Sequence, residues 1–272
     1  LNNKRIEVSN AGEVLLLANK KDNGLQSQLA RGKKRKGESN IEYRVFRMTA
    51  DDFTEYDLRL DRERFADYAT FFLPTREPDQ FLVAGFYTDV KYYDGTRGMF
   101  LIKGDIASGD LPKTFYRFDD AFLSDLISPE RLAKDKGLME GNYFTEMIEY
   151  SNGYYDFVAT RGIEQTFTNP AGSGRVQTGK SYTMYEIFIP RFDRDGNFLS
   201  VQKIQRFSVD SRSSATTHYL FQARNQTYLV FNNVKMRDRN DGRKLRDPRQ
   251  AHIDLAVFDN NYTKGDLESQ TS

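Results

Sequence analysis

The segments Ile6-Glu7-Val8-Ser9-Asn10-Ala11-Gly12 and Ile148-Glu149-Tyr150-Ser151-Asn152-Gly153 decide the fold, because one short motif occurs twice in the chain. Each copy ends in a polar turn and leads into an apolar stretch, Val14 to Ala18 after the first copy and Tyr154 to Ala159 after the second. Self-similarity of this kind is typical of repeat architectures, in which every unit folds alike. The motif therefore predicts an internally repeated β protein.

Two further segments place a polar turn before an apolar strand, at Asp79 and at Asn225. The turn residues 10, 79, 152 and 225 are 69, 73 and 73 positions apart, which gives a repeat of about 70 residues. Runs of aromatic and β-branched residues predict the remaining strands of each unit. These strands are Tyr43 to Met48, Tyr56 to Leu60, Tyr68 to Leu73, Phe81 to Tyr87, Met99 to Gly104, Thr114 to Phe118, Tyr143 to Ile148, Tyr182 to Phe192, Phe198 to Phe207, Thr217 to Phe221, Tyr228 to Phe231 and Ile253 to Phe258.

Four strands per unit is the pattern of a β-propeller blade, so we predict an all-β, β-propeller-like array of four-stranded units within a single domain, residues 1–272. The first unit lacks its opening strand in this interpretation, the last lacks its closing strand, and the chain does not begin with Met. The expected array is either a small closed ring or, the interpretation that we favour, the later part of a larger propeller. A β-sandwich is the alternative fold, since frequent turns can imitate a repeat. The predicted units are 1–62, 63–120, 141–208 and 215–265, with a helical insertion at 121–140.

Turn and cap residues support this division of the chain. Asparagine or aspartate precedes glycine at five places, where hairpin turns need positive φ angles: 23–24, 94–95, 152–153, 195–196 and 241–242. Ser128, Pro129 and Gly137 have the order of an N-cap, a first helical residue and a C-terminal glycine, which predicts one short helix near 128–137. We expect that helix to cover the edge of a unit.

Composition excludes several classes of function. The 272 residues carry a formal charge of +1, so attraction to a polyanion must come from local patches. The chain has no Cys, which rules out disulfides, thiolate nucleophiles and thiolate metal sites. No apolar run reaches the length of a membrane span, and no signal-peptide core is present in the sequence given.

Positive charge is concentrated in two long connections. Residues 20–41 hold seven basic and two acidic side chains, and residues 233–250 hold seven basic and three acidic side chains. Equivalent loops of a propeller emerge on one face, so we predict a basic face that docks an anionic partner, with solvated, mobile loops as the alternative. The predicted contact residues are Arg31, Lys33, Lys34, Arg35, Lys36, Arg237, Arg239, Arg243, Lys244 and Arg246. A third connection, residues 162–181, is nearly uncharged around 168–174, and we expect it to be a flexible loop.

Motifs for catalysis are scarce. No Walker A, GxGxxG or GxSxG run occurs, so no cofactor is predicted, and His218 and His252 lack metal-ligand spacing, so we expect them to be structural or exposed and predict no metal. The acidic run from Asp193 to Asn197 fits a hairpin turn better than a calcium loop. Glu146, Glu149 and Asp156 are candidate carboxylates of a glycosidase, although exposed strand charges are the simpler interpretation. No catalytic residue is therefore assigned.

Three segments carry a family resemblance: Phe81 to Tyr87 leading to Gly98-Met99-Phe100, Ile187 to Asn197, and Tyr228 to Asn233. They resemble the blade pattern of exported propeller proteins of the Bacteroidota cell envelope, over most of residues 79 to 260. The resemblance covers structural positions only. It implies an extracytoplasmic chain, in the periplasm or cell envelope, that works in a larger assembly.

The sequence thus predicts a non-catalytic protein-interaction module, an accessory subunit that docks through a loop face. Its expected partner is a protein with an acidic surface; a glycan is the next choice, and nucleic acid is disfavoured because no nucleic-acid-binding motif is present. The alternative function is a carbohydrate-active or sugar-binding propeller.

Overall fold

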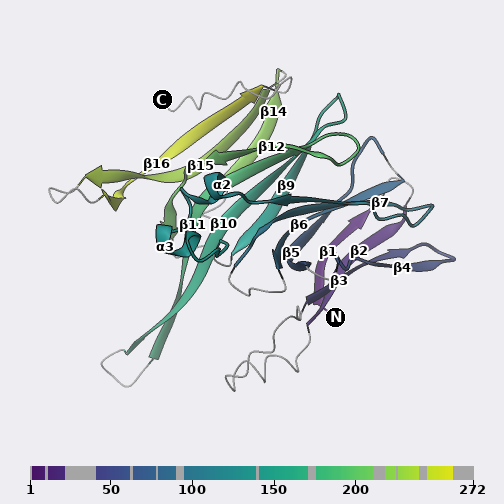
Figure 1. Cartoon of the computed structure of the whole chain (residues 1–272), viewed down its shortest axis with the longest axis horizontal. Helices are drawn as coiled ribbons and strands as arrows, with labels where there is room; N and C mark the ends of the chain where they lie inside the picture. Colours follow the sequence, from purple (N-terminus) through teal and green to yellow (C-terminus); the bar gives the residue numbers. More distant parts are fainter. Residues whose placement is uncertain are drawn as a thin grey trace. The chain divides into compact units, whose positions relative to one another are not determined.

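The computed structural model shows an all-β chain with two short helices among its described residues (Figure 1). Contact clustering divides the chain into two compact units. Unit 1 comprises Leu1–Ala159 and Pro190–Leu199, and unit 2 comprises Thr160–Ile189 and Ser200–Ser272. The structure describes residues 2–9, 12–21, 41–61, 64–77, 79–89, 95–138, 141–170, 176–210, 218–224, 226–238 and 244–259.

Two four-stranded antiparallel meanders belong entirely to unit 1. The first has the order β1-β2-β3-β4, and the second has the order β5-β6-β7-β8. Hydrogen-bonded neighbours are consecutive in sequence throughout both sheets, which is the order of an antiparallel meander. The bounds are β1 Asn2–Val8, β2 Val14–Lys21, β3 Ile41–Met48, β4 Phe53–Asp57, β5 Arg64–Phe72, β6 Gln80–Asp89, β7 Gly98–Asp105 and β8 Lys113–Arg117.

The third and fourth sheets continue the same meander pattern. The third has the order β12-β11-β10-β9, with the short strand β13 also paired to β11, and the fourth has the order β14-β15-β16. Strands β10 and β11 are long enough to contribute residues to both units. The bounds are β9 Asn142–Glu149, β10 Tyr155–Pro170, β11 Val176–Phe192, β12 Phe198–Ile204, β13 Ser208–Asp210, β14 His218–Ala223, β15 Gln226–Asp238 and β16 Lys244–Asp259.

The main core of unit 1 lies between the first two sheets. Leu15, Leu17 and Val45 of the first sheet belong to one buried cluster with Phe71 and Phe81 of the second. Tyr56 joins them, because its ring lies 5.3 Å from the Phe81 ring and its hydroxyl donates to the Ile106 carbonyl at 2.9 Å. Sheets that pack face to face bury the alternate residues of each strand in this way.

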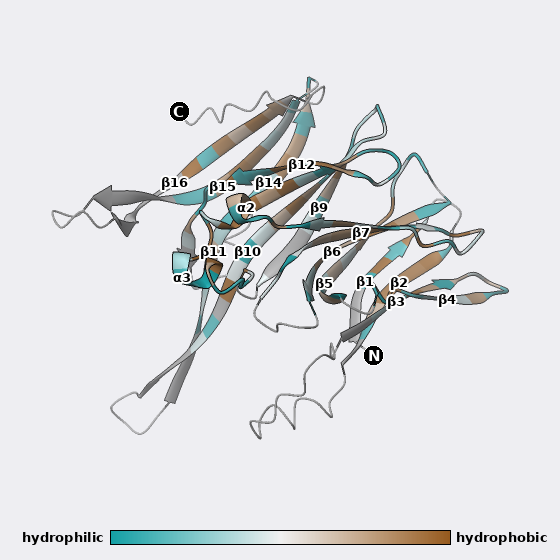
Figure 2. Ribbon diagram, viewed as in Figure 1, coloured by the Kyte–Doolittle hydropathy of each residue, from teal (hydrophilic) through white to brown (hydrophobic). Residues whose placement is uncertain are grey.

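Strand β6 is buried on both faces, as its almost uninterrupted buried pattern shows. One face carries Phe81 and Val83 of the core cluster. On the adjoining strand β5, Phe72 faces the other way and lies 5.2 Å from Phe157 of β10. A strand covered on both faces has a continuous apolar run rather than an alternating one, and Figure 2 shows hydrophobic residues concentrated in the strands while the turns are hydrophilic.

Glycines and aromatic rings are paired across strands β6 and β7. The register places Phe81 opposite Gly104, Gly85 opposite Phe100, and Tyr87 opposite Gly98. At each glycine, the position that a Cβ atom would take is already occupied by an atom of the partner ring, at 2.1 to 2.6 Å. The rings therefore cover the glycine backbone, and these three positions of the sheet have no room for a larger residue.

The turns of the two motif copies are closed by the same pattern of hydrogen bonds, with Tyr150, and not Ser151, in the place of Ser9. In the β1–β2 turn, Ser9 N donates to Glu13 O and Gly12 N donates to Ser9 O; in the β9–β10 turn, Tyr150 N donates to Tyr154 O and Gly153 N donates to Tyr150 O. Gly12 and Gly153 have φ angles of 80° and 85°, which only glycine adopts without cost. The turn from Asp193 to Asn197 repeats this pattern with Gly196, which confirms a hairpin turn there.

The predicted short helix is confirmed as α3, Pro129–Leu132, with Ser128 at its N-cap and Pro129 as its first residue. A second helical turn, α2 (Asp120–Leu123), precedes it and was not predicted. The end of this segment is attached to the second sheet, because Thr96 and Leu138 form an antiparallel bridge and Arg97 lies 2.9 Å from Asp135. Arg97 is buried, and its charge is paired with Asp135, an exposed residue of the segment that follows α3.

Unit 2 contains the rest of the β10–β11 hairpin, most of β12, β13 and the fourth sheet. Leu229, Phe231 and Phe258 are buried on one face of that sheet. Arg206 donates to the Asn232 carbonyl at 3.2 Å, and Phe207 N donates to the Asn233 side chain at 2.8 Å, so the residues before β13 are attached to β15.

The all-β class is confirmed, and so are four-stranded antiparallel sheets for the first two sheets, whereas the third has five strands and the fourth has three among the described residues. Closure into a propeller and the number of repeats stay predictions. Three expectations were wrong. The first unit does have an opening strand, β1. The connections 162–181 and 233–250 are largely strand, because β10 extends to Pro170, β11 begins at Val176, β15 extends to Asp238 and β16 begins at Lys244. Polar or charged strands that pair in a hairpin do not show the apolar alternation on which the sequence prediction depended.

Candidate functional site

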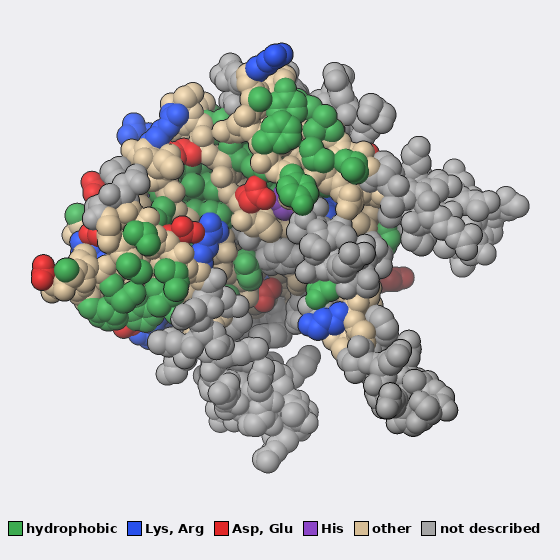
Figure 3. Space-filling model, turned by 180° about the vertical axis from the view of Figure 1, so that it is seen from behind, with side chains coloured by type: hydrophobic (Ala, Val, Ile, Leu, Met, Phe, Trp, Pro, Cys, Tyr) green, Lys and Arg blue, Asp and Glu red, His purple; other side chains and the backbone are tan. Residues whose placement is uncertain are grey.

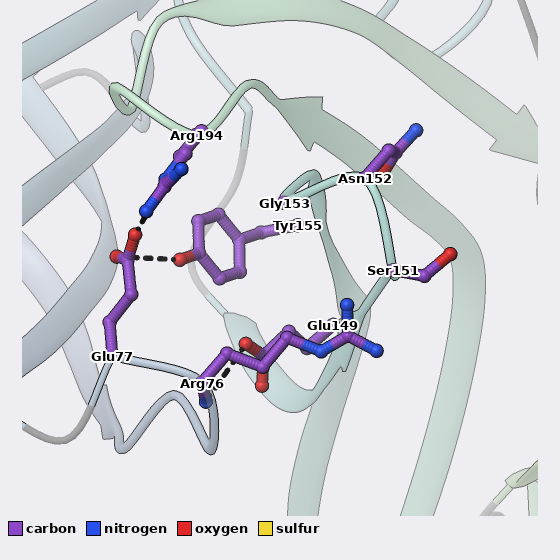
Figure 4. A pocket seen from close by; sticks show the side chains of 8 residues that line it. All are labelled: Arg76, Glu77, Glu149, Ser151, Asn152, Gly153, Tyr155 and Arg194. Atoms are coloured by element: carbon purple, nitrogen blue, oxygen red, sulfur yellow. Dashed lines mark hydrogen bonds and ion pairs between the residues drawn. The ribbon is translucent and has the colours of Figure 1, made fainter.

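A small polar hollow in unit 1 is the candidate site (Figure 4). Its volume is about 190 Å³. Three connections form it: the segment between β5 and β6, the turn between β9 and β10, and the turn between β11 and β12. The lining residues are Arg76, Glu77, Glu149, Ser151, Asn152, Gly153, Tyr155 and Arg194.

Glu77 is the centre of one side of the hollow. Its carboxylate accepts hydrogen bonds from the Tyr155 hydroxyl at 3.0 Å and from Arg194 Nε at 2.9 Å, and Lys103 Nζ lies 3.0 Å away. In Figure 4, Tyr155 and Arg194 both point at Glu77. Lys103 also donates to the Arg194 carbonyl at 2.5 Å, so the same cation holds the carboxylate and the turn that carries Arg194.

The environment of Glu77 favours its charged form. Burial raises the pKa of this carboxyl, but the hydrogen bonds from Lys103, Arg194 and Tyr155 outweigh burial and leave the pKa below its usual value. Burial and the adjacent Glu77 charge raise the pKa of the Tyr155 phenol, so this hydroxyl stays protonated and remains a donor. The arrangement is a fixed ion cluster at neutral pH.

Glu149 occupies the other side of the hollow and is held by the β5–β6 connection. Its carboxylate accepts from Thr75 N at 2.8 Å, from Thr75 Oγ1 at 2.5 Å and from Arg76 N at 3.2 Å. Glu149 is the glutamate of the repeated motif, whose first copy places Glu7 beside Arg5 at 2.6 Å instead. The motif thus supplies a residue that attaches one hairpin turn to a neighbouring segment.

Asp156 was expected to be an exposed strand charge, and this expectation was wrong. The side chain is buried on β10, where Arg191 forms two hydrogen bonds to it, both at 2.7 Å. The Tyr150 hydroxyl donates to the same carboxylate at 2.7 Å, and the Arg191 guanidinium lies over the Tyr150 ring. Residues 155–160 are all buried, so a charge within this run is buried with its partner.

The other candidates from the sequence are placed as follows. Glu146 is half-buried on β9, and His218 is buried at the start of β14, which confirms a structural position for this histidine. His252 lies in β16. Within the described ranges, no three His, Asp or Glu side chains come close enough together to hold a metal ion.

Most of the predicted basic face lies outside the described residues, namely Arg31, Lys33, Lys34, Arg35, Lys36, Arg239 and Arg243. Arg237, Lys244 and Arg246 lie on paired strands near the end of the β15–β16 hairpin, where the register joins Arg237 to Leu245 and Asp238 to Lys244. The first connection belongs to unit 1 and this hairpin to unit 2. The common basic face therefore stays a prediction.

Sequence reasoning missed Glu77, Tyr155 and Arg194 as a cluster. Glu77 lies 78 residues from Tyr155 and 117 from Arg194, and such distant partners leave no local spacing to detect. The available signal was the repeat itself, because Glu77 and Asn152 lie in the second and third of the four predicted turns.

Comparisons with known proteins add little. No protein-family model matches the chain, and no curated protein matches it. Among solved structures, the crystal structure of the polysaccharide lyase Uly1 is similar with a TM-score of 0.32 and 8% identity, over 94% of this chain. The chain spans 57% of the length of that protein. In the part of the chain that the structure describes, no helix combines the length and apolarity needed to cross a membrane.

Proposed function

We propose that this chain is a non-catalytic protein-interaction module, an accessory subunit that docks onto a larger cell-envelope assembly, with its sheets as the blades of a β-propeller. The observation that carries the proposal is that both carboxylates in the hollow are already bound by neighbouring groups of the protein. Glu77 is bound by three side-chain donors and Glu149 by the Thr75–Arg76 segment. Both acids attach separate parts of unit 1 to one another.

The electrostatics of the hollow support a structural role for these acids. A general acid needs a carboxyl whose pKa is raised toward the working pH, whereas the pKa of Glu77 is lowered. The volume of about 190 Å³ is also smaller than the roughly 300–1,000 Å³ of ordinary ligand pockets. A scaffold whose turns are fixed by ion pairs can hold surface loops in place for binding.

The contact surface in this proposal is the basic face, and the partner is a protein with an acidic surface. Residues 20–41 and 233–250 carry net charges of +5 and +4, while the whole chain carries only +1. Charge segregated in this way speeds association with an anionic surface and makes binding sensitive to salt.

The experiment is capture of the partner by the tagged chain, identified by mass spectrometry and then measured with purified components. Changing Lys33, Lys34, Arg35 and Lys36 to Ser should weaken binding at least tenfold at low salt and flatten its salt dependence. A control variant with Arg76→Ser and Lys134→Ser removes exposed charge outside the basic connections and should bind normally. Equal affinities of the two variants would remove the basic face as the contact surface, and binding of a glycan without any protein partner would favour the sugar-binding alternative.

A further inference from the structure

The acceptors and donors that line the polar hollow of unit 1 are used unequally. Both carboxylates are already occupied, because Glu77 and Glu149 each have three N–H or O–H donors within 3.2 Å. Several donors of the same lining, by contrast, have no acceptor among the residues that the structure describes. The unused capacity of the hollow is therefore a capacity to donate hydrogen bonds.

Arg76 supplies the largest share of these donors. Its backbone N–H donates to Glu149, but its guanidinium forms no hydrogen bond or ion pair with any described residue. A guanidinium carries five N–H donors in a planar fork that matches the oxygens of a carboxylate or a phosphate. In Figure 4 the Arg76 side chain extends along one edge of the hollow. This edge thus carries a positive charge that no side chain of the described part of the chain neutralises.

Arg194 is a second guanidinium at the hollow, and two contacts fix its direction. Its Nε donates to Glu77 at 2.9 Å, which uses one of its five donors. Its aliphatic stem lies against the β9–β10 turn, because a Cβ atom added at Gly153 would lie 3.3 Å from Cβ, Cγ and Cδ of Arg194. The two terminal nitrogens have no acceptor among the described residues. A side chain held in this way loses less freedom when it binds a ligand.

The β9–β10 turn adds two uncharged donors. The side-chain oxygen of Asn152 accepts from Tyr154 N at 3.1 Å, so the amide nitrogen of Asn152 is the group left to donate. The Ser151 hydroxyl is exposed at the hollow and has no partner within the described ranges. Donors therefore reach the hollow from three separate connections of unit 1.

Charge favours an anion in this place. Arg76, Arg194 and the Lys103 side chain that pairs with Glu77 carry three positive charges, against the two negative charges of Glu77 and Glu149. The cluster thus has a net charge of +1, and both of its carboxylates are covered by donors. Guanidinium groups form charge-assisted hydrogen bonds to oxyanions, which are the stronger class of hydrogen bond.

The lining offers nothing to an apolar ligand. Its one aromatic residue, Tyr155, is 1% exposed. The exposed large apolar side chains of the described residues lie on β1, β4, β12, β14 and β16, and Figure 3 shows those of the first and fourth sheets gathered in patches. A ligand in the hollow is therefore held by hydrogen bonds and charge, and not by stacking on a ring.

Volume and direction narrow the class further. A water molecule takes up about 30 Å³ in the liquid, so a hollow of about 190 Å³ has room for a small ion and a few waters. A carboxylate presents two oxygens in one plane, whereas a phosphate or sulfate group presents oxygens in four directions. Donors that come from three connections match the tetrahedral shape better.

We propose that the hollow binds a tetrahedral oxyanion, a phosphate or sulfate group, between Arg76 and Arg194, with Ser151 and Asn152 as further donors. The site lies outside the basic connections, so it goes beyond the proposed docking role. Glu77 acts here as a positioning residue, because it directs Arg194 without touching the ion.

The test is a titration of the isotope-labelled chain with inorganic phosphate, at an ionic strength kept constant with sodium chloride. The arginine Nε–H signals are followed by NMR, and Arg76→Gln and Arg194→Gln identify two of them, since each variant lacks one signal. We expect both signals to shift and saturate with a dissociation constant on the order of 1 mM. Each variant should weaken binding at least tenfold. Arg76→Gln removes no contact between described residues, so it should fold normally, which circular dichroism checks.

Arg59→Gln is the matched control. Arg59 is an exposed arginine that pairs with one carboxylate, Asp57, as Arg194 pairs with Glu77. Its replacement should leave the affinity for phosphate unchanged, and its own signal should not saturate together with those of the hollow. Equal shifts at Arg59 and Arg194, or shifts that do not saturate at tens of millimolar phosphate, would overturn the proposal.

Two further probes define the ligand. Acetate tests the shape, and acetate that binds as tightly as phosphate would overturn the tetrahedral class. Methyl phosphate, in which one oxygen is esterified, tests the source of the group. Affinity equal to that of phosphate supports a group carried by a larger molecule, and weaker binding supports the free ion.

This site and the docking role can fail independently. The variant with Lys33, Lys34, Arg35 and Lys36 changed to Ser leaves the hollow intact, so it should lose the acidic partner and still bind phosphate. Arg194→Gln should give the reverse result. Loss of phosphate binding in the first variant would place the anion in the basic connections and overturn the proposal.

Discussion

At the scale of single residues, Glu77 connects three segments of unit 1 through Lys103, Tyr155 and Arg194. Its pKa is lowered in the folded protein, so its charge contributes stability that is present above the usual glutamate pKa of 4.5 and is lost as the pH falls through the lower folded value. Glu77→Gln should therefore destabilise the protein at pH 7 by about 1–3 kcal/mol. The measurement is urea unfolding as a function of pH.

The difference between Glu77→Gln and the unmodified chain should start to shrink as the pH falls below 4.5, where the unfolded chain takes up a proton at Glu77, and should be lost once the pH is below the lower pKa of the folded protein. Glu130→Gln is a suitable control, since Glu130 is an exposed residue of α3. If the difference in the free energy of unfolding stays constant from pH 7 to pH 3, the lost stability does not come from the charge of Glu77.

The buried cluster of Tyr150, Asp156 and Arg191 has larger consequences. Arg191→Leu leaves the Asp156 carboxylate buried without its cation, which should cost about 3–5 kcal/mol. Tyr150→Phe removes one donor to the charged group and should cost about 1.5–3 kcal/mol. Chemical unfolding of the two single variants and the double variant gives the coupling, and strictly additive losses would contradict a shared network.

At the scale of the elements, the three glycine–aromatic pairs fix how closely β6 and β7 pack. A Cβ atom at Gly104 would lie 2.1 Å from Cζ of Phe81, whose side chain is fully buried. Gly104→Ala should therefore cost about 1–3 kcal/mol or more through overpacking. Adding Phe81→Leu should recover part of that loss, and thermal unfolding of the single and double variants measures it. If Phe81→Leu makes the Gly104→Ala variant worse, the ring is not the obstacle.

The repeated turn gives a second prediction at this scale. Gly12 has a φ of 80°, and a Cβ atom there would meet nothing within 4 Å. Gly12→Ala should thus cost about 1–2 kcal/mol from backbone conformation alone. Gly12→Asn should cost less, because asparagine tolerates this conformation. Equal losses in the two variants, measured by urea unfolding, would argue against a purely conformational origin.

Sequence reasoning found the elements whose residues carry local signals. The apolar run of β6, from Phe81 to Tyr87, and the Ser128-Pro129 cap both predicted correct elements. It failed at the polar ends of β10 and β11, which pair as strands but lack the apolar alternation that marks a strand in a sequence. The cluster at Glu77 depends on residues more than 70 positions apart, and tertiary packing alone brings them together.

At the scale of the whole molecule, two compact units share the β10–β11 hairpin. Unit 1 has a core between the first two sheets, and in unit 2 Leu229, Phe231 and Phe258 are buried. Compact units of one chain need not unfold together. We expect calorimetry to show two transitions, with Gly104→Ala lowering the transition of unit 1 only. A single transition that shifts as a whole would mean that the shared hairpin makes the two units cooperative.

The β10–β11 hairpin carries two ion pairs, and the acidic residue lies on β10 in one pair and on β11 in the other. Asp156 on β10 pairs with Arg191 on β11, whereas Arg161 on β10 pairs with Glu186 on β11. The two pairs lie five residues apart along each strand. If one strand is shifted by five residues past the other, either Asp156 comes to lie opposite Glu186 or Arg161 comes to lie opposite Arg191. Every such misaligned hairpin sets like charges against each other. The order of the charges thus disfavours a shift of five residues in either direction and favours the observed pairing of the two strands.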